Sequence, residues 1–197
     1  MVEHFRSGTK NKIYEKVKAM VVASSRLHAV RCYFEFERYI NKMGYQKELR
    51  VLAIFSGTVT DERKKFAGQG INKIKETELK GKFKGTDYQI LLAAEKYQTG
   101  YDEPLLHTMF VDKKFGVIKT VQTLPRLNRT CHSKEDTFIL DFVNSAEDIK
   151  KSFEPCYKDA DIEETTDANI AYEILNQNSM GLEYIGIQKL KILPKFF

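Results

Sequence analysis

The chain has 197 residues, 42% of them hydrophobic and 30% charged, with 32 Lys and Arg against 27 Asp and Glu. This composition excludes collagen-like, low-complexity and wholly disordered proteins, and the length suits one core with appendages. Apolar runs fall short of the ~18 residues of a membrane span, and the first ten residues lack the core of a signal peptide. The three cysteines are widely spaced, which suits reduced cytosol. We therefore expect a cytoplasmic protein without membrane contact.

The chain begins with a basic stretch, residues 1–17, that is expected to form a segment of its own. Residues 19–23 are an apolar run typical of a strand buried on both faces. A helix is predicted next, with Ser24 or Ser25 as its N-cap and apolar residues at spacings of three and four up to Gly44.

Further buried strands are predicted at residues 50–55, 88–94 and 105–111. The stretch 58–84 between the first two is polar and Lys-rich with three glycines, which indicates a surface excursion. A short helix is expected within it, near 76–83.

The last regular elements are a predicted helix at 117–128, a strand at 137–143 and a helix from 145 to about 153. Short apolar strands that alternate with helices predict an α/β fold, with a mostly parallel sheet flanked by helices on both faces. After Pro155 the pattern weakens, and residues 158–197 are expected to be a partial, truncated C-terminal extension.

Ligands of open parallel sheets bind beyond the carboxyl ends of the strands, so the turn at 98–102 is a candidate site. It offers the hydroxyl of Thr99, a glycine at Gly100 and the carboxylate of Asp102. Glycine and aspartate also form ordinary turns, so the residues alone leave both interpretations open.

Two arginines, Arg126 and Arg129, are three residues apart and would share one face of the predicted helix, with Gln122 one turn earlier. Two guanidinium groups suit a phosphate better than a core, although a solvated basic face remains the alternative. Pro125 stands between them and can kink the helix that orients both arginines.

Together these residues carry a family resemblance. The run Thr99-Gly100-Tyr101-Asp102, followed by Gln122, Arg126 and Arg129, resembles motifs V and VI of superfamily-two helicases and translocases. The longer stretches LLAAEKYQTGYDEPLLHTMFVDKK and VQTLPRLNRTCHSKEDTFILDFVN resemble, more narrowly, the second RecA-like motor lobe in the R (restriction) subunit of type I restriction-modification enzymes.

The resemblance covers residues 2 to about 157 and includes motif IV in KAMVVASSRLHAV and the following strand and loop in LAIFSGTVTDE. It departs at Pro125, where related sequences usually have a small residue, and it fades beyond Asp167. The resemblance implies a three-layer, RecA-like (P-loop NTPase-like) lobe at 18–157.

In such motors ATP and Mg are held between two lobes. The resemblance implies that Arg126 and Arg129 reach the γ-phosphate, that Gln122 assists them, and that Gly100 and Asp102 touch the nucleotide near its ribose. It also implies backbone contacts to double-stranded DNA, in which hydroxyls, N–H groups and one cation hold phosphates, at six residues: Ser24, Ser25, Arg26, Ser56, Gly57 and Thr99.

Half of an ATP site is missing from the sequence. It has no GxxxxGK[ST] run and no Asp-Glu pair that ends an apolar strand as Mg ligands do. The four histidines are scattered, and His107 within an apolar strand is expected in the core, so no metal site is predicted. The chain is therefore expected to be a catalytically inactive fragment that binds no nucleotide stably.

The intact enzyme implied by the resemblance is an ATP-dependent DNA translocase and endonuclease. Its other parts would be the first RecA-like lobe, a nuclease domain, and separate modification and specificity subunits. Two alternatives stay open: the corresponding lobe of another superfamily-two motor, and a non-catalytic module that binds nucleic acid or a protein partner. A dinucleotide-binding oxidoreductase is disfavoured because no GxGxxG follows a strand.

Overall fold

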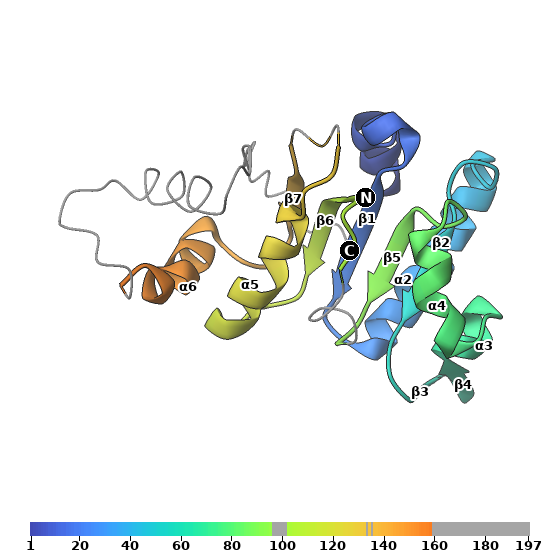
Figure 1. The fold of residues 1–197 in the computed structure, drawn as a ribbon. Helices are drawn as coiled ribbons and strands as arrows, with labels where there is room; N and C mark the ends of the chain where they lie inside the picture. The colour runs from blue at the N-terminus through green and yellow to red at the C-terminus, as the bar shows by residue number, and fades with distance from the viewer. Residues whose placement is uncertain (96–101, 133, 135, 159–197) are drawn as a thin grey trace.

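The computed structural model describes residues 1–95, 102–132, 134 and 136–158 (Figure 1). The elements in chain order are α1 (Val2–His4), the π-helical turn η1 (Phe5–Thr9), the 3-10 turn η2 (Ile13–Glu15), β1 (Lys18–Ala23), α2 (Arg26–Met43), β2 (Val51–Ile54), β3 (Thr58–Asp61), β4 (Lys64–Ala67), α3 (Gly68–Asn72), α4 (Glu76–Lys84), β5 (Ile90–Ala93), β6 (Leu106–Asp112), α5 (Val117–Thr123), the 3-10 turn η3 (Leu124–Asn128), β7 (Phe138–Asp141) and α6 (Ala146–Lys158).

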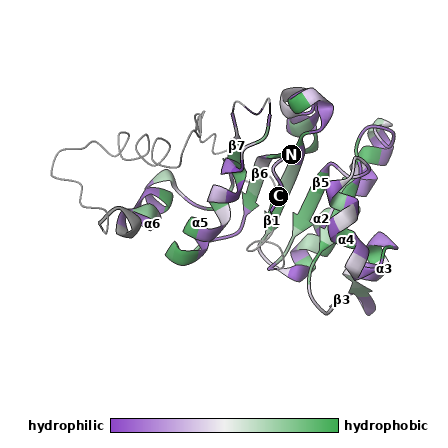
Figure 2. Cartoon of the chain, in the orientation of Figure 1, coloured by the Kyte–Doolittle hydropathy of each residue, from purple (hydrophilic) through white to green (hydrophobic). Residues whose placement is uncertain are grey.

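Five strands form one sheet in the order β2-β5-β1-β6-β7, and every neighbouring pair is parallel. The expected α/β fold with a mostly parallel sheet is confirmed. The strands that were predicted from unbroken apolar runs are buried on both sides, and Figure 2 shows the hydrophobic residues concentrated in them.

Each face of the sheet is covered by its own layer. The first core joins Val21 of β1 and Phe110 of β6 to α2 and to the N-terminal turns. The second core joins Met20 and Met109, on the opposite face of the same strands, to α4, η3 and α6. Because side chains alternate along a strand, consecutive residues of β1 contribute to different layers.

The N-terminal residues 1–17 pack against the first face of the sheet. Val2, Phe5 and Ile13 are at most 6% exposed and belong to the first core. Three basic residues of this segment, Arg6, Lys10 and Lys12, form ion pairs with acids elsewhere, as Lys10 does with Glu48 at 2.7 Å. The segment is thus basic, as its sequence shows, and its apolar residues contribute to the core.

The boundaries of α2 follow its sequence. The Ser25 hydroxyl accepts a hydrogen bond from the backbone N–H of His28 at 3.1 Å, so Ser25 is the N-cap. The helix ends at Gly44, whose φ of +75° lies in the left-handed region that glycine adopts without strain.

Two elements differ from the expectation. The excursion 58–84 contains the expected helix, α4, but also the antiparallel hairpin β3–β4. The single helix expected at 117–128 is divided into α5 and the 3-10 turn η3, which has Pro125 near its start. Arg129 follows η3 with extended backbone angles, so the prediction that Arg126 and Arg129 share one α-helical face is wrong.

At one edge of the sheet, strand β2, the side chain of Asn72 binds the backbone of Ala53. The Asn72 amide accepts a hydrogen bond from Ala53 N–H at 2.9 Å and donates one to Ala53 C=O at 2.6 Å. Asn72 therefore pairs with the outward-facing N–H and C=O groups of Ala53 as a residue of a neighbouring strand would. None of the described helices is long and apolar enough to cross a membrane.

Candidate nucleotide and nucleic-acid sites

The predicted site residues that the structure describes lie at two opposite edges of the sheet, where the parallel strands begin and where they end. Asp102 comes shortly before β6, and Arg129 lies between η3 and β7, so both are at the amino ends of these strands. Ser24, Arg26 and Ser56 follow β1 and β2 and lie at the carboxyl ends. All five strands are parallel, so the sheet separates the two groups.

At the amino edge, Arg129 Nε lies 3.0 Å from Asp102 Oδ1, and the two side chains are 58% and 65% exposed. Burial and the charge of Arg129 lower the pKa of Arg126, while the charge of Asp102 opposes this effect. The structure thus brings both arginines near Asp102, and it leaves Gln122 exposed in the last turn of α5. Two neighbouring guanidinium groups repel each other, and an anion placed between them would relieve that repulsion.

The backbone around this arginine pair is fixed by Lys134, which the sequence did not single out. Its ammonium donates hydrogen bonds to the carbonyls of Pro104, Leu106, Leu127 and Arg129 at 2.6 to 3.2 Å. It therefore ties the segment after Asp102 to the segment that carries Arg129. Burial lowers the pKa of Lys134 to about 8. Nothing in local spacing predicts this set of contacts, because the four carbonyls come from two segments that are distant in sequence, 104–106 and 127–129.

At the carboxyl edge, Arg26 connects the ends of β1 and β2. Its guanidinium donates to the Ser56 carbonyl at 3.0 Å. Gly57 has φ of +70°, and a Cβ on it would lie 3.3 Å from Arg26 Nη1, so both conformation and space favour glycine there. Ser24, Ser25, Arg26, Ser56 and Gly57 are all exposed. These five residues form one polar surface, which we call the carboxyl-edge cluster.

The start of α2 is fixed to the neighbouring strand by an ion pair. His28 Nε2 lies 2.6 Å from Asp112 Oδ2, at the end of β6. The contact with Asp112, followed by that with Cys32, raises the pKa of His28 to about 10, and His28 lowers the pKa of Asp112. The imidazolium therefore holds the N-terminus of α2, and with it the carboxyl-edge cluster, against the sheet.

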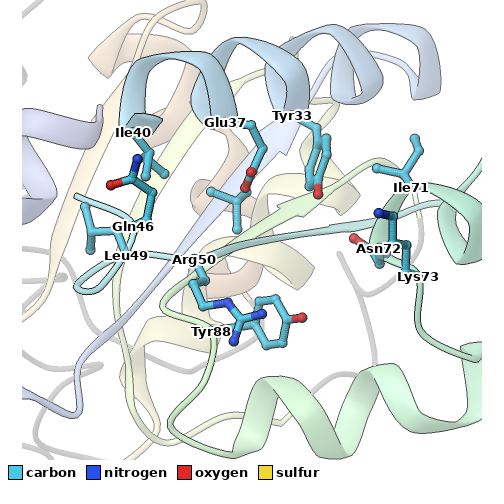
Figure 3. A pocket seen from close by; sticks show the side chains of 11 residues that line it. Tyr33, Glu37, Ile40, Gln46, Leu49, Arg50, Ile71, Asn72, Lys73 and Tyr88 are labelled. Atoms are coloured by element: carbon cyan, nitrogen blue, oxygen red, sulfur yellow. The ribbon is translucent and has the colours of Figure 1, made fainter. Parts of the chain in front are cut away.

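A cavity of about 250 Å³ lies apart from both groups, between α2 and the amino end of β2 (Figure 3). Arg50 lies over the ring of Tyr88 at 4.9 Å on one side, and Tyr33 and Glu37 line the side of α2. Burial raises the pKa of Glu37 and raises that of Tyr33 to about 12. None of the predicted site residues that the structure describes lines this cavity.

Two predicted site residues, Thr99 and Gly100, lie outside the described residues. In the described part of the chain, no group of three or more His, Cys, Asp or Glu side chains could hold a metal ion. His107 is 1% exposed and bonds through Nε2 to Asp136 at 2.8 Å, so its predicted place in the core is confirmed.

Comparison with known proteins supports the family resemblance. Residues 71–144 match the family model of the type I restriction enzyme subunit R domain 3. Two proteins of Methanocaldococcus jannaschii, named as MjaIXP and MjaVIIP type I restriction enzyme endonuclease subunits, are 28% identical over 177 residues and 26% identical over 155 residues. These alignments cover 88% and 73% of this chain but only 16% and 14% of those relatives.

Two solved structures are similar at low identity. They are the second DEAD-box helicase domain of Mss116p bound to an RNA duplex (21% identical, TM-score 0.45, 89% of this chain and 62% of that one) and the C-terminal part of the Fun30 ATPase domain (13%, 0.44, 90% and 54%). The resemblance to the second lobe of type I R subunits, predicted from the sequence, is confirmed by the family model and the two sequence relatives.

Proposed function

We propose that this chain acts as the second RecA-like lobe of the ATP-dependent DNA translocase and endonuclease subunit of a type I restriction system. In this role it supplies Arg126 and Arg129 to an ATP site that a first lobe completes, and it holds the DNA backbone at the carboxyl-edge cluster. The partners would be double-stranded DNA, the first lobe, a nuclease domain, and the modification and specificity subunits.

The observation that carries the proposal is the exposed ion pair between Arg129 and Asp102, with Arg126 close by. An exposed ion pair contributes about 0 to 1 kcal/mol, so the terminal phosphate of ATP can replace the carboxylate at Arg129. The bound ATP–Mg complex supplies the phosphoryl group to be transferred. The two arginines would bind and orient its oxygens, and Lys134 would fix the backbone from which Arg129 extends.

The ATP part is tested by Arg129→Ala in the R subunit that carries this lobe. We expect ATP turnover to fall about 1000-fold, as for other arginine fingers, with a stability change within about 0.5 kcal/mol. Arg38→Ala is a matched control, because Arg38 also forms an exposed ion pair, with Glu35 at 2.5 Å. Normal turnover in the Arg129 variant would remove the proposed role.

The DNA part is tested with this chain alone by fluorescence anisotropy on unrelated duplexes at several salt concentrations. Binding should be weak, indifferent to sequence and steeply reduced by salt, because backbone contacts release counterions and read no bases. Arg26→Glu should weaken it, and Lys47→Glu, at the amino side of β2, should not. Tight, salt-resistant binding to a single sequence would contradict this part.

The same chain should show no ATP turnover above background and at best millimolar nucleotide affinity by itself, since the phosphate loop is absent from its sequence. DNA-stimulated hydrolysis by the isolated chain would favour a different class of enzyme.

A further inference from the structure

We infer that the hairpin β3–β4 is a further DNA-backbone contact, made by the face that carries Thr58, Thr60 and Lys65. This inference rests on the proposed function, because it extends the surface that begins at the carboxyl-edge cluster. Figure 1 shows the hairpin at the end of the molecule where α2 begins.

The hairpin is held in place by α2 through three contacts along that helix. Arg26 binds the Ser56 carbonyl at the entrance to the hairpin. Arg31 donates two hydrogen bonds, at 2.9 and 2.8 Å, to the carboxylate of Asp61. The rings of Phe34 and Phe66 meet edge to face with centroids 5.4 Å apart. A contact surface on this hairpin would therefore be pre-organised, which reduces the entropy lost on binding.

The two faces of the hairpin have different chemistry. Val59 pairs with Phe66, and both pack against the first core. Thr60 pairs with Lys65, and Thr58 is two residues before Thr60, so these three side chains share the opposite face. All three are exposed. Hydroxyls and an ammonium group in a row are the donors that hold phosphates in protein–DNA interfaces.

The charge of the hairpin suits an anionic partner. Arg63, Lys64 and Lys65 follow one another and are exposed, and no ion pair of these three appears in the described part of the chain. Of the two acids, Asp61 is bound by Arg31, and Glu62 lies in the turn. The outer face carries no aromatic side chain that could stack on a base, so we expect contact with the sugar-phosphate backbone.

The hairpin also continues directly from the residues already proposed to contact DNA. Ser56 and Gly57 immediately precede β3, and Gly57 turns the chain with φ of +70°. A DNA strand whose phosphates contact the carboxyl-edge cluster would therefore next reach the hairpin face that carries Thr58, Thr60 and Lys65.

The test measures anisotropy of a fluorescein-labelled 20-base-pair duplex at about 50 mM salt with the whole chain. Lys65→Glu should weaken binding about tenfold and reduce the slope of log affinity against log salt by about 1. Lys47→Glu changes the net charge equally, from an exposed turn at the amino side of β2, and should change affinity less than twofold.

A second measurement tests proximity instead of charge. Thr60→Cys, modified with a photoreactive group, should cross-link to the duplex, whereas Lys47→Cys modified in the same way should not. If Lys65→Glu behaves like Lys47→Glu and the cross-link fails while Arg26→Glu still weakens binding, the hairpin inference is wrong and the proposed function stands. If the chain shows no salt-dependent DNA binding at all, both are wrong.

Discussion

At the scale of single residues, two cations near the proposed ATP site differ in what they contact. Arg129 meets one exposed carboxylate, whereas the Lys134 ammonium is surrounded by four backbone carbonyls. Arg129 can therefore release the carboxylate of Asp102 and bind a phosphate in its place. Lys134 binds backbone carbonyls, which cannot move away to make room for a ligand, and its effect is to fix the chain.

Lys134→Met should therefore destabilise the fold by about 2 to 3 kcal/mol, because it leaves several carbonyls without a donor. Urea unfolding of this variant and of Arg129→Ala gives the comparison, and the arginine variant should lose no more than about 0.5 kcal/mol. Equal stability of the two variants would show that the carbonyl contacts of Lys134 contribute little.

The ion pair of His28 with Asp112 predicts a pH dependence. The pKa of His28 is raised to about 10, so the folded chain holds a proton that the unfolded chain releases near pH 6.5. The stabilisation is complete below pH 6.5 and is lost as the pH rises toward 10. His28 is 39% exposed, so we discount the shift for solvent screening and expect about 1 kcal/mol.

The difference in unfolding free energy between the wild-type chain and His28→Gln should accordingly be about 1 kcal/mol near pH 6 and close to zero near pH 10. Because the pKa of Asp112 is lowered, the same difference should also shrink as the pH falls below about 4. A difference that is constant from pH 6 to 10 would show that the pair is not ionised as described.

At the scale of elements, the strands and α2 were predictable because their signals are local. Buried parallel strands are unbroken apolar runs, and α2 carries its N-cap, its apolar stripe and its final glycine in sequence. The hairpin was missed because its strands have four residues each and only Val59 and Phe66 face the core. The helix predicted at 117–128 is longer than the observed α5, because a proline can either kink a helix or end it. At Pro125 the chain changes to a 3-10 turn.

Two glycines, one directly after α2 and one inside α4, give opposite predictions. Gly44→Ala should cost about 1 kcal/mol, because an alanine must adopt φ of +75° although the space around it is open. Gly81→Ala should stabilise the chain by about 0.5 to 1 kcal/mol, because Gly81 lies inside α4 with nothing near its added Cβ. Thermal melts of the two variants check both signs, and a shift of the same sign in both would contradict the backbone argument.

At the scale of the whole molecule, the directions of the strands in the sheet determine which predicted site residues lie together. The turn around Asp102 was expected beyond the carboxyl end of a strand, and the structure places Asp102 at the amino end of β6 instead. The family resemblance implies that Asp102 lies near the two arginines. It does not show that this group is separated from the carboxyl-edge cluster, which follows from the parallel pairing of β6 with β1. Lys134 and Asp112 were missed because they bind Pro104 and His28, respectively, which are distant in sequence.

The contact of Asn72 with β2 has a consequence for how copies of this protein behave together. Asn72 satisfies the N–H and C=O groups of Ala53 that an uncovered edge strand would offer to another chain. Asn72→Ala would expose this edge, and we expect concentration-dependent self-association that sedimentation velocity would detect. A monomeric Asn72 variant at high concentration would show that other residues protect the edge. In the native chain, the Asn72 amide thus already occupies the backbone groups of Ala53 with which another copy could pair.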